Sequence, residues 1–80
     1  MEMFIDGGWR SAVSGATQPV TNPTTGAVID TVPTGDEQDA DIAIRAADRA
    51  LASWRAVPVA ERARLQRRAA QLMRDNADRI

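Results

Sequence analysis

The sequence predicts an α/β protein in which two pairs of strands come first and two helices follow. Turn residues and β-branched runs dominate residues 1–35, whereas the rest of the chain has the apolar spacing of amphipathic helices. We therefore expect strands and turns over 1–35, a first helix over 36–54 and a second helix over 58–77. No internal repeat or flexible linker interrupts this order.

The first strand pair is predicted at Phe4–Trp9, which reads FIDGGW. Asp6-Gly7 between apolar residues favours a two-residue hairpin turn, because glycine accepts the positive φ that the turn needs. Ser14-Gly15 indicates a further turn before the extended residues 18–21. Pro19 has no N–H to donate, so this second strand is expected at a sheet edge.

The second strand pair is predicted around the turn NPTTG at residues 22–26. Asn22 can cap the turn, the proline after it presets φ at the first central position, and Gly26 suits a left-handed closing residue. The chain then enters the β-branched run 27–32, which Pro33 ends.

The first helix has a start signal and an apolar stripe. Asp36 can act as N-cap with Asp39 at N3, an arrangement that resembles a capping box. Asp41 and Arg45 are spaced to pair across one turn. The stripe consists mostly of methyl groups, so we expect it to pack closely against another element; its members are Ala43, Ala46, Ala47, Ala50, Leu51 and Trp54.

The second helix is predicted to begin with Pro58 at N1, which would make Val57 an N-cap without a side-chain acceptor. One face of this helix would carry the mostly apolar residues Leu65, Ala69, Leu72 and Met73 together with Asn76. No glycine cap, polar tail or proline follows at 78–80, so we expect helical sequence to continue beyond Ile80.

The composition excludes several kinds of chemistry. The chain has no cysteine and no histidine, which rules out disulfides, thiolate nucleophiles and imidazole ligands within it. Its serines have no neighbouring base, and its glycines lack the spacing of phosphate-binding loops. We therefore predict no catalytic and no cofactor-binding residue in the chain.

The net charge is −1, although arginines dominate the second helix. A basic helix can bind nucleic acid, but these arginines share no single face and lack interleaved aromatic residues, so solvated or intramolecular ion-pairing roles are favoured. No segment has the pattern of a signal peptide or a membrane span, and we expect a soluble cytoplasmic protein without nucleic-acid or membrane partners.

The predicted core is thin, because 15 of the hydrophobic residues are alanine. Trp9 and Trp54 are predicted as core anchors. Two interpretations of this thin core remain open. The chain is either a piece that further sequence completes, or a free-standing, non-enzymatic interaction module whose alanine stripe docks on a partner or on a second copy.

The order of motifs resembles the N-terminal segment of the aldehyde dehydrogenase superfamily. The similarity is carried by FIDGGW, the NPTTG turn, the acidic helix start, the AADRALASW helix and the helix that begins ERARL. It extends over residues 1–80 and is greatest toward succinate-semialdehyde dehydrogenases and related semialdehyde enzymes.

The resemblance implies an NAD- or NADP-dependent oxidation of an aldehyde to an acid by a homodimer or homotetramer. Residues 1–80 would be the N-terminal part of a Rossmann-like cofactor-binding domain, with the remainder of the subunit as their partner. The catalytic cysteine, the glutamate base and the cofactor-binding glycine loop would lie beyond residue 80. In members with a structural monovalent cation, the two main-chain carbonyls before the Asn-Pro turn take part, which here implies Val20 and Thr21.

Overall fold

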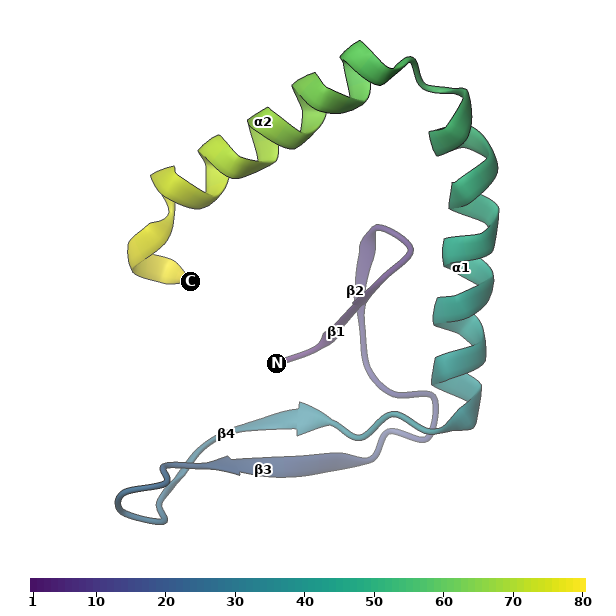
Figure 1. Cartoon of the computed structure of the whole chain (residues 1–80). Coiled ribbons are helices and arrows are strands. Elements are labelled where there is room, and N and C mark those ends of the chain that lie inside the picture. The colour runs from purple at the N-terminus through teal and green to yellow at the C-terminus, as the bar shows by residue number, and fades with distance from the viewer. The chain divides into compact units, whose positions relative to one another are not determined.

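The computed structural model describes all residues 1–80 and has four strands, two α-helices and a short 3₁₀ helix (Figure 1). Contacts divide the chain into two compact units, Met1–Ala50 and Leu51–Ile80. The predicted order of strand pairs followed by helices is confirmed. The elements are β1 (Met3–Ile5), β2 (Gly8–Arg10), β3 (Thr17–Thr21), β4 (Val28–Pro33), α1 (Glu37–Ala56), α2 (Val59–Asp75) and η1 (Ala77–Arg79).

Strands β1 and β2 form an antiparallel hairpin with Phe4 opposite Trp9. Asp6 and Gly7, with φ of 55° and 75°, make the two-residue turn. Two successive positive φ angles give the right-handed twist that tight hairpins need, so the predicted Asp-Gly turn is confirmed. The rings of Phe4 and Trp9 meet edge to face, with centroids 5.0 Å apart.

Strands β3 and β4 form a second antiparallel hairpin in which Pro19 faces Thr31 and Thr17 faces Pro33. Every strand of a two-stranded sheet is an edge strand, which is where prolines are tolerated. The predicted turn between these strands is confirmed: the Asn22 side-chain oxygen accepts the N–H of Thr24 at 2.8 Å. The N–H of Gly26, whose φ is 75°, donates to the Asn22 carbonyl at 2.7 Å.

Helix α1 begins with the predicted capping box. Asp36 Oδ1 accepts the backbone N–H groups of Gln38 at 2.9 Å and Asp39 at 3.3 Å, while Asp39 Oδ2 accepts the N–H of Asp36 at 3.0 Å. The expected pair along the helix is also present, with Arg45 Nε donating to Asp41 Oδ2 at 2.7 Å. The helix ends at Ala56, two residues beyond the predicted end.

Helix α2 corrects one prediction about its start. Pro58 is the N-cap and not N1: its ψ of 147° is extended, and its carbonyl accepts the N–H of Arg62 at 3.0 Å. Because proline has no side-chain acceptor, the helix starts without a side-chain cap. At the other end α2 stops at Asp75, and residues 77–79 continue as the 3₁₀ helix η1 instead of extending the α-helix to 77.

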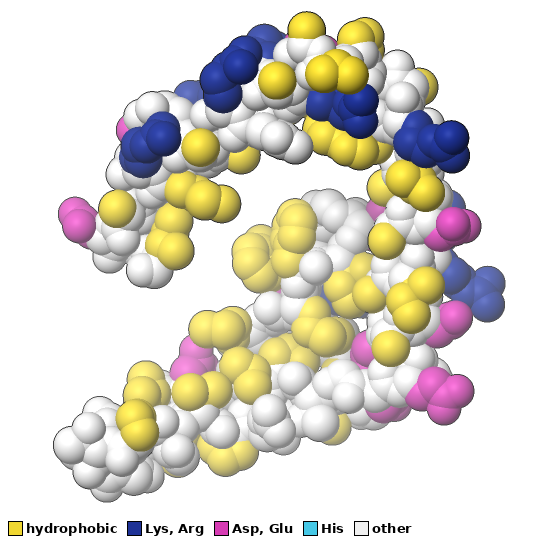
Figure 2. Space-filling view, in the orientation of Figure 1, with side chains coloured by type: hydrophobic (Ala, Val, Ile, Leu, Met, Phe, Trp, Pro, Cys, Tyr) yellow, Lys and Arg dark blue, Asp and Glu magenta, His cyan; other side chains and the backbone are white.

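The apolar side chains remain largely exposed, as the yellow atoms of Figure 2 show. Ala12 and Ala46 are the only buried hydrophobic residues. The prediction that the tryptophans anchor the core is therefore wrong for this chain, since Trp9 is 67% and Trp54 38% exposed. The large apolar side chains of the chain are themselves exposed, so they do not enclose either indole ring.

Neither helix combines the length and the apolar character that crossing a membrane requires.

Candidate functional site

The β1–β2 hairpin and helix α1 form a shallow groove in the N-terminal unit. Its volume is about 360 Å³. The alanines of the predicted stripe form one wall, so this part of the stripe does face another element. The groove is lined by Phe4, Ile5, Asp6, Gly7, Ala43, Ala46, Ala47 and Ala50.

The tip of the hairpin carries an ion pair to the same helix. Arg49 Nη2 donates to Asp6 Oδ2 at 3.2 Å. Both side chains are more than half exposed, so the pair contributes roughly 0.2–1 kcal/mol at most. The contact places Arg49 of α1 beside the turn.

The loop after β2 is joined to the start of α1 through Asp39. This residue is 4% exposed and is the only buried charged side chain. Its Oδ1 accepts the N–H of Val13 at 2.9 Å, while Oδ2 completes the capping box. A single carboxylate therefore connects segments 26 residues apart in the sequence.

These hydrogen bonds hold the pKa of Asp39 below its ordinary value. The N–H of Asp36 contributes most and the N–H of Val13 next, with smaller effects from the Asp36 side chain and the positive charge of Arg10. Burial raises the pKa, but its effect is smaller than the combined effect of the interactions that lower it. The two N–H donors and the positive charge of Arg10 favour the ionised form, so Asp39 is a carboxylate at neutral pH.

Val20 and Thr21, the residues predicted to offer carbonyls to a monovalent cation, are the last two residues of β3 and are exposed. The register passes from Val20 opposite Asp30 to Thr21 opposite Val28, so a β-bulge lies between them and leaves Ile29 without a direct partner. A bulge redirects nearby backbone groups. Hard cations take about six or more oxygen ligands, so two carbonyls could form only part of such a site.

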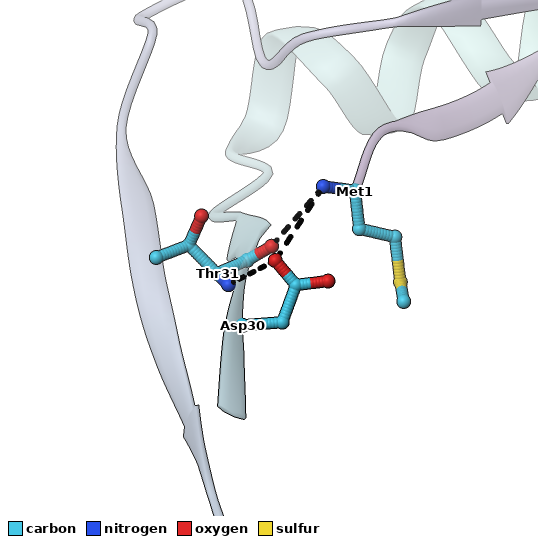
Figure 3. A network of polar contacts seen from close by, with 3 residues as sticks. All are labelled: Met1, Asp30 and Thr31. Carbon is cyan, nitrogen blue, oxygen red and sulfur yellow. Dashed lines mark hydrogen bonds and ion pairs between the residues drawn. The ribbon is translucent and has the colours of Figure 1, made fainter. Parts of the chain in front are cut away.

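A small polar network lies on β4 beside this bulge (Figure 3). The Met1 amino group donates to the Thr31 carbonyl at 3.4 Å and lies 3.9 Å from Asp30 Oδ1. The Thr31 N–H donates to the same Asp30 oxygen at 2.7 Å. The Asp30 carboxylate thus accepts one hydrogen bond and pairs with the Met1 amino group. Cation binding at the carbonyls of Val20 and Thr21 stays a prediction.

The arginines of α2 include one that pairs within the helix, as the sequence predicted. Arg64 donates from Nε and Nη2 to the two carboxylate oxygens of Glu61, at 2.9 and 2.6 Å. This bidentate contact lowers the pKa of Glu61 and raises that of Arg64.

Figure 2 shows acidic side chains along α1 and basic ones mainly on α2. No group of three or more acidic side chains that could hold a metal ion occurs in the chain.

Sequence reasoning did not find the contact of Asp39 with Val13 or that of Asp6 with Arg49. Asp39 was identified only as the N3 acid of a capping box, whereas Asp6 was identified only as a turn residue. Residue spacing gives no signal for either contact, because each joins residues from separate elements.

Two hairpins followed by a capped amphipathic helix define an α/β protein, and the comparison with protein families shows the family to which it belongs. Residues 9–80 match the model of the aldehyde dehydrogenase family. The chain therefore belongs to the aldehyde dehydrogenase family.

Curated relatives agree with this assignment. The chain is 46% identical over 77 residues to a glutarate-semialdehyde dehydrogenase of Pseudomonas putida, covering 96% of this chain. It is 40% identical over 78 residues to a hydroxyisobutyraldehyde dehydrogenase of Mycolicibacterium austroafricanum, covering 98%. It is 36% identical over all 80 residues to a D-glyceraldehyde dehydrogenase (NADP(+)) of Picrophilus torridus. In each case the chain spans 16% of the relative's length.

Proposed function

We propose that this chain is the N-terminal part of an NAD(P)-dependent aldehyde dehydrogenase. The observation that carries the proposal is the family match over residues 9–80, together with relatives named as aldehyde dehydrogenases at 36–46% identity. The reaction would convert an aldehyde, water and NAD(P)⁺ into a carboxylate, NAD(P)H and two protons. The catalytic and cofactor-binding groups would lie in sequence beyond residue 80, so the chain alone would be inert.

The proposed substrate is a semialdehyde, that is, an aldehyde that also carries a carboxylate. The glutarate-semialdehyde dehydrogenase of P. putida, at 46% identity, supports this substrate class. The hydroxyisobutyraldehyde and D-glyceraldehyde enzymes are named for uncharged aldehydes, so recognition of the substrate carboxylate is the feature that the experiment must test.

In the whole subunit, residues 1–80 would form the entrance to a Rossmann-like cofactor-binding domain. The apolar stripe of α1 is only partly covered, and its exposed residues Leu51 and Trp54 support a role in which further sequence covers them. A cytoplasmic homodimer or homotetramer is the proposed assembly. Val20 and Thr21 are proposed to contribute carbonyls to a structural monovalent cation, with the adjacent bulge as support.

The test is an assay of the intact gene product for NAD⁺ and NADP⁺ reduction. We expect kcat/KM for glutarate semialdehyde to exceed that for pentanal by about tenfold, the effect of one hydrogen bond to a charged group. The 80-residue chain alone should give no reduction. Failure of both cofactors with every aldehyde would refute the proposed activity, and equal kcat/KM values would refute only the semialdehyde preference.

The cation proposal is tested on the same protein. A bound ion stabilises the folded state by mass action, so the melting temperature should be higher in potassium or sodium chloride than in tetramethylammonium chloride at equal ionic strength. Identical melting temperatures in the three salts would exclude the ion.

A further inference from the structure

Asp39 differs from the other acids of the chain in its burial and in its partners. At 4% exposure it is enclosed, yet both of its oxygens are bonded to backbone N–H groups. A carboxylate that accepts from two backbone donors loses one acceptor position when it takes up a proton, and the N–H that loses its acceptor no longer contributes a hydrogen bond to a charged group.

The two donors come from different elements. The Val13 N–H belongs to the loop between β2 and β3, and the Asp36 N–H belongs to the residue that caps α1. Next to Val13 lies Ala12, which is 5% exposed and whose carbonyl accepts the N–H of Gly15 at 2.9 Å. The segment that Asp39 binds is therefore a turn that has its own backbone hydrogen bond and whose first residue, Ala12, is buried.

The cap of α1 does not depend on Asp39 alone. Asp36 Oδ1 independently accepts the N–H groups of Gln38 and Asp39. Loss of the Asp39 carboxylate should therefore free the loop while the first turn of the helix stays capped. The contact with Val13 is separable from helix formation for this reason.

We propose that Asp39 is an acid-sensitive latch that, when ionised, holds the loop at residues 12–15 against the start of α1 and, when protonated, releases it. The charged groups that act on Asp39 are Asp36, from the start of the same helix, and Arg10, from β2. Gly35 and the Met3 sulfur lie on another side, where a Cβ on Gly35 would be 3.6 Å from the Asp39 Cβ and 3.7 Å from that sulfur.

The direction of the pH effect follows from the lowered pKa of Asp39. A depressed pKa in the folded state means that the stabilisation is fully present above the ordinary value and is lost as pH falls through the folded value. The latch is thus closed at neutral pH and opens in acid, below the usual range of an aspartate.

The test is hydrogen exchange of the intact gene product, comparing Asp39→Asn with the unaltered protein at the same pH. At neutral pH we expect the amides of Val13 and Asp36 to exchange about tenfold faster in Asp39→Asn, because the amide group cannot accept from both. In acid, below the folded pKa of Asp39, the two proteins should exchange alike, since the unaltered residue is then neutral as well.

A role of Asp39 in packing alone would give the same difference at both pH values, and that result would overturn the latch. Asp36→Ala is the matched control, in which the start of α1 should exchange faster while Val13 stays protected. If Asp39→Asn does not fold, hydrogen exchange of the unaltered protein, measured as a function of pH, tests the proposal instead. The Val13 and Asp36 amides must lose protection with one common midpoint, and separate midpoints would contradict the proposal.

Discussion

At the residue scale, polar side chains accept backbone N–H groups at the turn between β3 and β4 and at the start of α1. Asn22 caps the turn between β3 and β4, and Asp36 caps α1. Each accepts N–H groups two or three residues ahead, which is a local geometry that short polar side chains adopt readily. Three glycines, Gly7, Gly15 and Gly26, supply the positive φ angles that these reversals also need.

Gly7→Ala should loosen the first hairpin. Its φ is +75° and no atom lies within 4 Å of a Cβ placed there, so the cost is backbone strain of about 1–2 kcal/mol and not a clash. We expect the amides of β1 and β2 to exchange roughly 5–30 times faster in the intact gene product.

Gly8→Ala is the control for that change. Gly8 does not have a positive φ, and its added Cβ would lie 4.0 Å from the Ile5 carbonyl oxygen, an ordinary contact. The amides of β1 and β2 in Gly8→Ala should exchange at nearly the same rates as in the unaltered protein. Equal effects of the two substitutions would show that side-chain volume, and not the left-handed turn, determines hairpin stability.

At the element scale, the two helices start in different ways. Helix α1 has a reciprocal capping box, whereas α2 starts at Pro58 with no side-chain cap. The first turn of α2 instead carries the exposed pair of Glu61 and Arg64. The start of α1 therefore depends on particular side chains, and that of α2 depends on the fixed backbone of proline.

Asp36→Ala should weaken the start of α1 by about 1 kcal/mol, because two N–H groups lose their acceptor. The amides of residues 37–40 should exchange about fivefold faster, as measured by mass spectrometry on the intact gene product. Asp36→Asn keeps an acceptor oxygen and should change little. A loss of protection in Asp36→Asn equal to that in Asp36→Ala would argue against capping as the cause.

The elements could be predicted from local chemistry, but their contacts could not. Asp6-Gly7, the NPTTG turn and Asp36 each act on residues close in sequence, and all three were predicted correctly. The bond from Val13 to Asp39 and the ion pair of Asp6 with Arg49 span 26 and 43 residues. Residue type does not determine which distant backbone group a carboxylate meets, so these contacts required the structure.

At the scale of the whole molecule, the chain has more apolar surface than it can enclose. Phe4, Val28, Ile29 and Ile44 are each at least 60% exposed, and only two alanines are buried among the hydrophobic residues. Large exposed apolar areas mark surfaces that other groups cover. The similarity to relatives of which this chain spans 16% agrees with a cover supplied by further sequence of the same subunit.

Thermal melting of the isolated chain, followed by circular dichroism at two protein concentrations, tests most directly whether these 80 residues need further sequence to form a stable fold. We expect a partly helical signal that declines gradually, without a cooperative step, because little apolar area is buried to oppose the entropy of ordering. A sharp transition whose midpoint is the same at both concentrations would contradict this expectation.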